Sequence, residues 1–290
     1  TQFVTASKGY LSGYIDFGAG ASAFKRGYLY STDDSGQNWT KMNDLVASDL
    51  KKVQMVDALN GFAVGSNGIL LQTVDGGTTW DLKLQRYYGD AATYNDLYFI
   101  NASKGIIVGD RGIIKITTNA GASFAANSNY PTATTHHYSS ITFDGTYFYV
   151  TRNNAAGTES EIWKSSAVNS AFTFTWAIMS NTRSTDLQKI QIEPGGNGYA
   201  VGIDGTLLKT ANNGGKWTTV ATGLSNNFRD VYFKQNMTDG VAIIDSIPGY
   251  GLIYKTTDGG QNWTLLSLHN GTYFNSFYFY QNDKGYVVGN

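Results

Sequence analysis

The chain of 290 residues contains no cysteine and only 3 proline residues. Without cysteine it has no disulfide, no thiol nucleophile and no cysteine-ligated zinc. Charged residues are also scarce, at 15%, and the formal net charge of −1 gives no overall attraction to nucleic acid. No apolar run approaches the roughly 18 residues of a membrane-spanning helix. We therefore expect neither a nucleic-acid partner nor a membrane span.

Aromatic residues and glycine are abundant instead, with 20 Tyr, 15 Phe, 6 Trp and 34 Gly. An aromatic-rich chain with almost no net charge is not intrinsically disordered. Ala, Glu, Lys and Leu do not dominate, which argues against a coiled coil or a helical bundle. The polar residues are mostly Thr, Ser, Asn and Gly. This composition favours an extracytoplasmic location: periplasmic, secreted or surface-attached.

An eight-residue motif recurs along the chain. Clear copies are TDDSGQNW, TVDGGTTW, TANNGGKW and TTDGGQNW, which end at Trp39, Trp80, Trp217 and Trp263. A weaker copy, TTNAGASF, ends at Phe124, and a degenerate segment ends at Trp176. A period in the forties is typical of propeller blades with four strands each, although two-helix repeats can also be this long.

Short apolar runs bounded by glycine precede each motif, and they decide between strands and helices. In the second repeat these runs cover residues 53–56, 61–65 and 68–71, and residues 80–84 follow with the motif tryptophan. They are four to six residues long, β-branched or aromatic, and separated by Gly, Asn and Asp, which predicts strands and turns. Each repeat is therefore predicted to be a four-stranded antiparallel meander. Radial stacking of such sheets buries both of their faces, as in a β-propeller.

The repeats predict an all-β protein with a single β-propeller domain over residues 1–290. Six repeats are complete, from near Phe3 to near Leu266, and a C-terminal half repeat follows in residues 277–289. We favour seven blades of which the last is incomplete. A six-bladed ring with a C-terminal annex is the alternative.

The motif Thr/Ser-x-Asp-x-Gly-x-Thr-Trp resembles the Asp-box, or bacterial-neuraminidase repeat. The longer pattern in residues 64–80 and 201–217 is most similar to photosystem II stability/assembly factor-like propellers. The resemblance covers nearly the whole chain and implies the fold. Asp-box propellers include hydrolases, receptors and assembly factors, so function has to be argued from a site. Photosynthetic members of the resembling family help to assemble a membrane protein complex through an Arg-rich surface.

The motif residues are predicted to have a structural role. The Asp or Asn accepts backbone N–H groups of the turn, the Gly supplies positive φ, and the Trp packs over the hairpin. A row of calcium-binding or catalytic carboxylates is the functional alternative, but one carboxylate per blade does not bring two together. The residues assigned to this structural Asp-box set are Asp34, Asp75, Asn119, Asn212, Asp258, Trp39, Trp80, Trp217 and Trp263.

The two ends of a meander differ in sequence. The turns between the first and second strands and between the third and fourth strands share one edge with the motifs, which we call the box edge. The other connections share the opposite edge, which we call the top edge. They are predicted to be long loops, over residues 14–26, 85–96, 126–139, 152–161, 179–189, 245–250 and 267–276.

All six arginines of the chain lie at or beside the predicted top-edge loops. An Arg fork binds carboxylate or phosphate through two hydrogen bonds, and Arg and Tyr are enriched in interface hot spots. The predicted binding residues are Arg86, Arg111, Arg152, Arg183, Arg229, Tyr87, Tyr88 and Tyr250. The alternative is that each Arg pairs with a local carboxylate on its own blade, in which case this site does not exist.

Evidence for catalysis is weak. The N-terminal Phe/Tyr-Arg-x-Pro motif of sialidases is missing, and the chain contains only three Glu, at 159, 161 and 193. A glycosidase needs two carboxylates flanking one bond, and the sequence does not show which top-edge Asp side chains converge. The adjacent residues His136 and His137 would point to opposite sides of an extended segment. We assign no catalytic residue, no metal and no cofactor, and the enzyme question stays open.

These observations predict a non-catalytic extracytoplasmic platform for binding or assembly. It would present Arg and aromatic side chains of the top edge to a protein segment or another carboxylate-bearing ligand. The alternative is a carbohydrate-active propeller, lectin-like or sialidase- or glycosidase-like. In that case the exposed aromatic residues would stack on a glycan.

Overall fold

The computed structural model describes residues 2–17, 24–46, 48–84, 92–125, 135–183, 186–245, 250–271, 273–281 and 284–289. These residues form 25 β-strands, and the short 3-10 turn η2 (Ser66–Gly68) is the only helical element among them. The chain divides into two compact units, Thr1–Thr134 and Thr135–Asn290.

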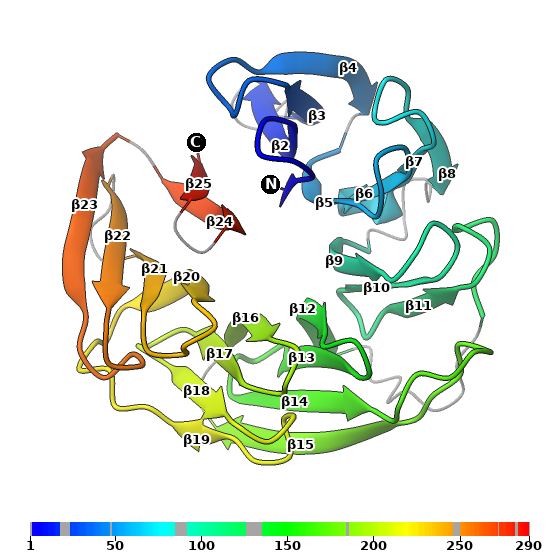
Figure 1. The fold of residues 1–290 in the computed structure, drawn as a ribbon. Helices are drawn as coiled ribbons and strands as arrows, with labels where there is room; N and C mark the ends of the chain where they lie inside the picture. Colours follow the sequence, from blue (N-terminus) through cyan, green and yellow to red (C-terminus); the bar gives the residue numbers. More distant parts are fainter. Residues whose placement is uncertain are drawn as a thin grey trace. The chain divides into compact units, whose positions relative to one another are not determined.

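The first unit contains three antiparallel sheets in which each strand pairs with its neighbours in sequence (Figure 1). The first sheet consists of β1 (Gln2–Phe3), β2 (Gly9–Phe17), β3 (Phe24–Thr32) and β4 (Thr40–Val46). The second consists of β5 (Leu50–Met55), β6 (Gly61–Gly65), β7 (Leu70–Thr73) and β8 (Asp81–Leu84). The third consists of β9 (Tyr94–Phe99), β10 (Gly105–Gly109) and β11 (Ile114–Thr117).

The second unit contains three four-stranded sheets and one two-stranded sheet, again in sequence order. The first of these sheets is β12 (His136–Phe143), β13 (Phe148–Asn154), β14 (Glu159–Ser165) and β15 (Trp176–Arg183). The next is β16 (Leu187–Ile192), β17 (Gly198–Gly202), β18 (Leu207–Thr210) and β19 (Thr218–Thr219). The last two are β20 (Asn227–Phe233), β21 (Gly240–Asp245), β22 (Tyr250–Thr256) and β23 (Thr264–Asn270), and then β24 (Phe274–Gln281) with β25 (Lys284–Gly289).

The second strands of the repeat show why each sheet needs neighbours. All five residues of β6, β10 and β17 are buried, because other strands lie beside them and other sheets pack on their faces. Their flanking glycines allow close backbone approach. A Cβ atom at Gly65 would lie only 1.9 Å from the carbonyl oxygen of Asp49, so no other residue fits there without a shift of the backbone.

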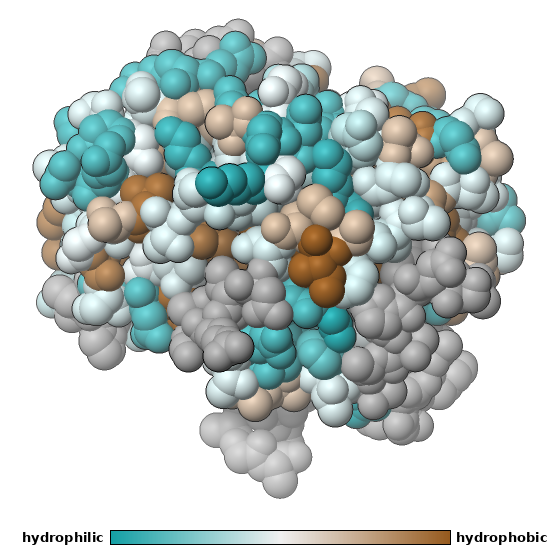
Figure 2. All heavy atoms as spheres, turned by 90° about the horizontal axis from the view of Figure 1, so that it is seen from below, coloured by the Kyte–Doolittle hydropathy of each residue, from teal (hydrophilic) through white to brown (hydrophobic). Residues whose placement is uncertain are grey.

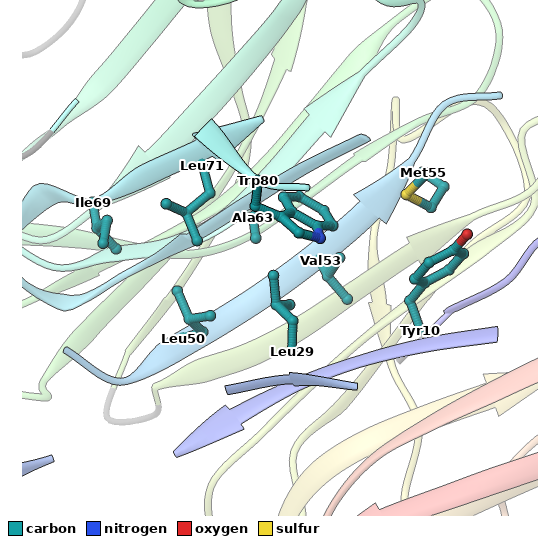
Figure 3. Close-up of a cluster of buried hydrophobic side chains, with 9 residues drawn as sticks. All are labelled: Tyr10, Leu29, Leu50, Val53, Met55, Ala63, Ile69, Leu71 and Trp80. Carbon is teal, nitrogen blue, oxygen red and sulfur yellow. The ribbon is translucent and has the colours of Figure 1, made fainter. Parts of the chain in front are cut away.

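Apolar side chains of adjacent sheets form the cores between blades. Figure 3 shows one such cluster in the first unit, where residues of the first sheet meet residues of the second. It consists of Tyr10, Leu29, Leu50, Val53, Met55, Ala63, Ile69, Leu71 and Trp80. The Tyr10 hydroxyl donates a hydrogen bond of 2.8 Å to the carbonyl oxygen of Gly76, in the turn that carries the second motif. The motif turn is thus anchored to the neighbouring blade.

Glutamine side chains connect the first strands of adjacent sheets. Gln54 on β5 donates to the carbonyl oxygen of Phe99 on β9 at 3.0 Å and accepts from the Phe99 N–H at 2.7 Å. Gln2 on β1 makes the same two contacts with Met55 on β5. One amide thus imitates a pair of ladder hydrogen bonds across the gap between two blades.

The predicted fold class is confirmed: the protein is all-β, with four-stranded antiparallel propeller blades. Six blades are followed by the two-stranded sheet β24–β25, which corresponds to the C-terminal half repeat. The six blades match the number in our alternative, and an incomplete seventh blade is compatible with the two extra strands. In the third sheet the expected fourth strand is reduced, among the described residues, to one bridge between Ile116 and Ala125. A single domain over residues 1–290 stays a prediction.

Several predicted top-edge loops are instead extensions of strand pairs. In the first sheet β2 and β3 remain paired as far as Phe17 and Phe24, inside the predicted loop 14–26. Likewise β13 and β14 remain paired as far as Asn153 and Ser160, inside the predicted loop 152–161. Ladder hydrogen bonds join backbone groups and do not require apolar side chains, so pairing continues into segments that were expected to be loops, and Asn153 and Ser160 are buried there.

Candidate functional site

Each motif turn at the box edge contains the same pattern of hydrogen bonds. In the second motif the Thr73 hydroxyl donates to Asp75 Oδ1 at 2.8 Å and accepts from the Gly77 N–H at 2.8 Å. Asp75 also accepts from the Thr79 N–H at 2.9 Å and from its hydroxyl at 2.6 Å. Three of these contacts recur in the other motifs: the Thr hydroxyl donates to the Asx oxygen, the turn glycine N–H donates to the Thr hydroxyl, and the N–H four positions after the Asx residue donates to its oxygen. The Asx residues of these motifs are Asp34, Asn119, Asn212 and Asp258.

These contacts stabilise the ionised form of the motif carboxylates. The Asn38 N–H, together with the Thr32 hydroxyl and the Asn38 amide, lowers the pKa of Asp34 to about 2. Asn262 and Thr256 lower the pKa of Asp258 to about 2 in the same way. Asn119 and Asn212 occupy the equivalent position without a charge. The geometry therefore agrees with turn formation as the role of the Asx residue.

The motif tryptophans pack on neighbouring aromatic rings or in the cores between blades. Trp39 lies edge-on to Phe3 with 5.9 Å between ring centroids, and Trp263 lies edge-on to Phe228 at 5.5 Å. Trp80 and Trp217 belong to apolar clusters between sheets. These four side chains contribute to packing.

The prediction that the degenerate motif ends at Trp176 is wrong by two residues. Asn169 accepts from the Thr173 N–H at 3.1 Å, and its amide donates to the Thr173 hydroxyl at 2.8 Å. This is the contact that the other motifs make between the Asx residue and the residue four positions later. The aromatic residue of the fourth motif is therefore Phe174, which is 6% exposed, and not Trp176. The missing tryptophan at position 174 had hidden the alignment.

The predicted binding residues fall on the top edge wherever the structure describes them. Arg86, Tyr87 and Tyr88 lie outside the described residues. Arg152, Arg183, Arg229 and Tyr250 lie at the top-edge ends of β13, β15, β20 and β22, and Arg111 lies in the turn between β10 and β11. The side chain of Arg183 lies outside the described part, whereas its backbone is paired with Glu159.

Arg152 is the centre of a buried polar cluster on the first sheet of the second unit. Its guanidinium group bonds to Glu161 Oε2 at 2.5 Å, and these side chains are only 8% and 11% exposed. Trp163 donates its indole N–H to the same carboxylate oxygen at 2.7 Å, and its ring lies 5.5 Å from the Arg152 Cζ atom. Strand register places Tyr138 opposite Arg152, and burial raises the pKa of Tyr138 to about 12. His136 lies on β12 together with Tyr138, and burial and the Arg152 charge lower the pKa of His136.

Arg229 is also paired locally, but it is accessible. Its Nε lies 2.7 Å from Asp245 Oδ1, within one sheet, and its side chain is 44% exposed. Arg152 and Arg229 are thus each bound to a carboxylate on their own blade, as the structural alternative requires of them. An exposed pair of this kind contributes little to stability, so Arg229 can exchange Asp245 for a ligand carboxylate at low cost, whereas Arg152 cannot.

Arg111 occupies an unusual backbone conformation. The residue has a φ of 55° and its side chain is exposed. The corresponding turns of the second and fifth repeats place Asn67 and Asp204 in the same conformation, with φ of 57° and 53°. Asn and Asp adopt left-handed backbone readily and Arg does not. The turn therefore holds this guanidinium group at the top edge despite a local energetic cost.

Buried carboxylates on the first strands were missed in the sequence. Asp96 on β9 is 3% exposed and lies 3.7 Å from the Lys52 Nζ on β5. Asp230, at the equivalent position of β20, is 5% exposed and accepts from the Ser276 hydroxyl and the Phe277 N–H on β24, both at 2.9 Å. Both contacts join adjacent blades. The sequence signal is an Asp two residues after a buried aromatic residue, Tyr94 or Phe228, in both repeats, although its place next to a top-edge loop suggests a loop charge.

Figure 2 shows one face of the molecule, on which hydrophobic side chains lie in small groups between hydrophilic ones. None of the described residues belongs to a helix with the length and hydrophobicity needed to traverse a bilayer. In the same part of the chain, no three His, Asp or Glu side chains gather as ligands for a metal ion.

Comparison with known proteins confirms the resemblance noted above. The profile of the family described as photosynthesis system II assembly factor YCF48 matches residues 31–128. The chloroplastic photosystem II stability/assembly factor HCF136 of Guillardia theta is 42% identical over 48 residues, which represent 16% of this chain and 12% of that protein. The match thus spans a small part of that relative.

Solved structures resemble the chain over almost its full length. YCF48 bound to D1 peptide has a TM-score of 0.70 at 17% identity and covers 99% of this chain and 88% of its own. YCF48 from Cyanidioschyzon merolae has a TM-score of 0.67 at 16% identity, with coverage of 98% and 96%. A GH74 xyloglucanase from Xanthomonas campestris has a TM-score of 0.64 at 15% identity, with coverage of 84% and 43%. At these identities the likeness establishes the propeller fold, which assembly factors and glycosidases share.

Proposed function

We propose that this protein is a non-catalytic platform that binds a carboxylate-bearing segment of a partner protein at its top edge. The observation that carries the proposal is the likeness of nearly the whole chain to a propeller solved with a bound peptide, YCF48 with D1 peptide. The composition supports an extracytoplasmic location.

The top edge offers suitable chemistry. Arg111 is exposed and held in position by its turn, and Arg229 is accessible. A guanidinium fork binds a carboxylate through two parallel hydrogen bonds. Tyr250 begins β22 at the same edge and is half-buried, so it can add an aromatic contact. Arg152 has a different role in this proposal: its buried pair with Glu161 shapes the edge and does not reach a ligand.

Peptide binding by fluorescence anisotropy tests the proposal. The probes are D1 peptide and a set of unrelated peptides, each with a free or an amidated C-terminal carboxyl group. The test variant replaces Arg86, Arg111 and Arg229 by Ala. The control variant replaces Lys8, Lys104 and Lys216 by Ala, which removes the same charge from turns at the box edge.

We expect a free-acid peptide to bind the wild type and the lysine variant equally, and to bind the arginine variant at least about tenfold more weakly, as for loss of one or more charge-assisted contacts. Equal binding to all three proteins would show that the top-edge arginines are not the site. Binding of oligosaccharides but of no peptide would replace the proposal by the carbohydrate-active alternative.

A further inference from the structure

Five Asn-Gly sequences occur in the chain, and this dipeptide is prone to spontaneous deamidation. The backbone nitrogen of the glycine attacks the Cγ atom of the Asn side chain and forms a cyclic succinimide. The bond from Cγ to the amide nitrogen breaks, and the amide leaves as ammonia with the proton of the glycine N–H. Water then opens the ring to aspartate or isoaspartate. The five sequences begin at Asn60, Asn67, Asn197, Asn213 and Asn270.

In four of these sequences the fold already uses the glycine N–H. Gly68 donates to a backbone carbonyl oxygen at 2.7 Å, and Gly214 donates to the Thr210 hydroxyl at 3.1 Å. Gly61 and Gly198 are each paired with a strand on both sides, so their N–H groups belong to the ladders. All four glycines are buried. Their nitrogen atoms are therefore protected from taking part in ring closure.

Close neighbours also restrict the movement that ring closure requires. A Cβ atom at Gly198 would lie 2.5 Å from the carbonyl oxygen of Gln191, and one at Gly214 would lie 2.6 Å from the Cε1 atom of Tyr149. The side-chain amide of Asn67 donates to a serine hydroxyl at 2.9 Å, which holds that side chain in place.

Asn270 and Gly271 differ from the other pairs on each of these points. Asn270 is the last residue of β23, Gly271 follows in a turn with a φ of 72°, and both are exposed. Within the part of the chain that the structure describes, neither the Gly271 N–H nor the Asn270 side chain has a hydrogen-bond partner. A Cβ atom at Gly271 would meet no heavy atom within 4 Å beyond its chain neighbours. The glycine nitrogen can thus reach the Asn270 Cγ atom without opening of the fold.

We propose that Asn270 is the residue at which the folded protein deamidates, and that the carboxylate formed there weakens binding of acidic ligands at the top edge. Asn270 is paired with Tyr250, which belongs to the proposed binding surface. Deamidation adds one negative charge beside this surface, and like charges repel a ligand carboxylate. The effect on binding rests on the proposed function, whereas the position of the modification does not.

Incubation of the whole protein at mildly alkaline pH, followed by tandem mass spectrometry, tests the position. In the folded protein we expect Asn270 to deamidate at least about tenfold faster than the other four Asn residues, because their glycine N–H groups become accessible only after local opening of the fold. In urea all five should react at similar rates, since no fold protects them. Gly271→Ala is the matched variant: its methyl group crowds the attacking nitrogen and should slow the reaction at Asn270.

Two results would overturn this assignment. One is faster deamidation of another Asn-Gly sequence in the folded protein. The other is a reaction at Asn270 that is much slower in the folded protein than in urea. Both comparisons use the unchanged chain, so they decide the question even if Gly271→Ala is unstable.

Asn270→Asp reproduces one of the two products and tests the effect on binding. At low ionic strength it should bind the free-acid peptide roughly twofold to fivefold more weakly than the wild type, as for one like charge a few ångströms from the ligand in water. The amidated peptide should bind both proteins equally. Equal binding of the free-acid peptide would overturn the effect on binding. A wild-type protein that binds neither peptide would refute the proposed function, while mass spectrometry still decides where the chain deamidates.

Discussion

Replacement of Gln54 by Leu tests whether the glutamine bridges between blades stabilise the propeller. The side chain joins β5 to β9 through hydrogen bonds of 3.0 Å and 2.7 Å with one backbone residue, Phe99. Leucine has a similar size and can make neither bond. Each hydrogen bond contributes about 1 kcal/mol net, so we expect the free energy of unfolding to fall by about 2 kcal/mol.

Thermal and urea unfolding of the two proteins measure this loss. In a chain of 290 residues about 2 kcal/mol lowers the unfolding midpoint by roughly 3–4 °C. The matched control is Gln188→Leu, at an exposed position of β16, which changes the same chemical groups without breaking a bridge. An equal shift in both variants, or no shift in Gln54→Leu, would refute the idea that these amides connect the blades.

Three further predictions concern the two edges. The double variant Asp34→Asn/Asp258→Asn should keep the fold, and its free energy of unfolding should depend less on pH between about pH 4 and pH 2 in acid titration. Carboxylates with a pKa lowered to about 2 stabilise the native state above their unfolded pKa and lose this contribution as pH falls. Arg152→Met costs about 3–5 kcal/mol in urea unfolding, since it leaves the buried Glu161 carboxylate without its cation; adding Glu161→Gln recovers part of the loss. Arg111→Asn stabilises the protein by about 0.5–1 kcal/mol by calorimetry, because Asn suits the left-handed backbone, and weakens binding of the free-acid peptide.

Each of these predictions has a contrary outcome. Native acid sensitivity in the double Asn variant would mean that other carboxylates control acid unfolding. Full stability of Arg152→Met would show that the guanidinium group is not needed to neutralise Glu161. A less stable Arg111→Asn protein would indicate that the arginine side chain makes contacts worth more than its backbone strain.

The sequence predicted the fold well because the repeat supplies its own alignment. Glycine-bounded runs such as Gly61–Gly65 recur in register, and each became a buried second strand. Local hydrogen bonding predicted the motif turns, since Thr73, Asp75 and Thr79 lie within one turn of chain. The fourth motif was misplaced because Phe174 replaces the tryptophan that marked the others.

The top edge was harder to predict, because its contacts join residues that are distant in sequence. Arg152 meets Glu161 through strand pairing, and Asp230 meets Ser276 on the next blade. Composition alone could not show that Arg152 is buried and Arg229 accessible. The strand extension beyond Tyr14 was also missed, although Ile15, Asp16 and Phe17 alternate between apolar and polar, because the glycine- and alanine-rich residues 18–23 follow directly and are typical of a loop.

Comparison of the repeats with one another separates structural from functional positions. At the box edge the Asx residue is Asp in the second motif and Asn in the third and fifth, and in all three it accepts the N–H of the residue four positions later. The fold therefore needs the oxygen acceptor and not the charge. At the top edge the left-handed turn position is Asn67, Arg111 and Asp204 in three repeats. Of these three, only Arg111 departs from the residues that this backbone favours, and it is exposed. Left-handed backbone at Ala120, Phe172 and Met237 shows that this propeller accepts such a cost at other turns as well. The Arg111→Asn variant therefore separates a binding role of the guanidinium group from a purely structural one: only the first predicts weaker binding of the free-acid peptide.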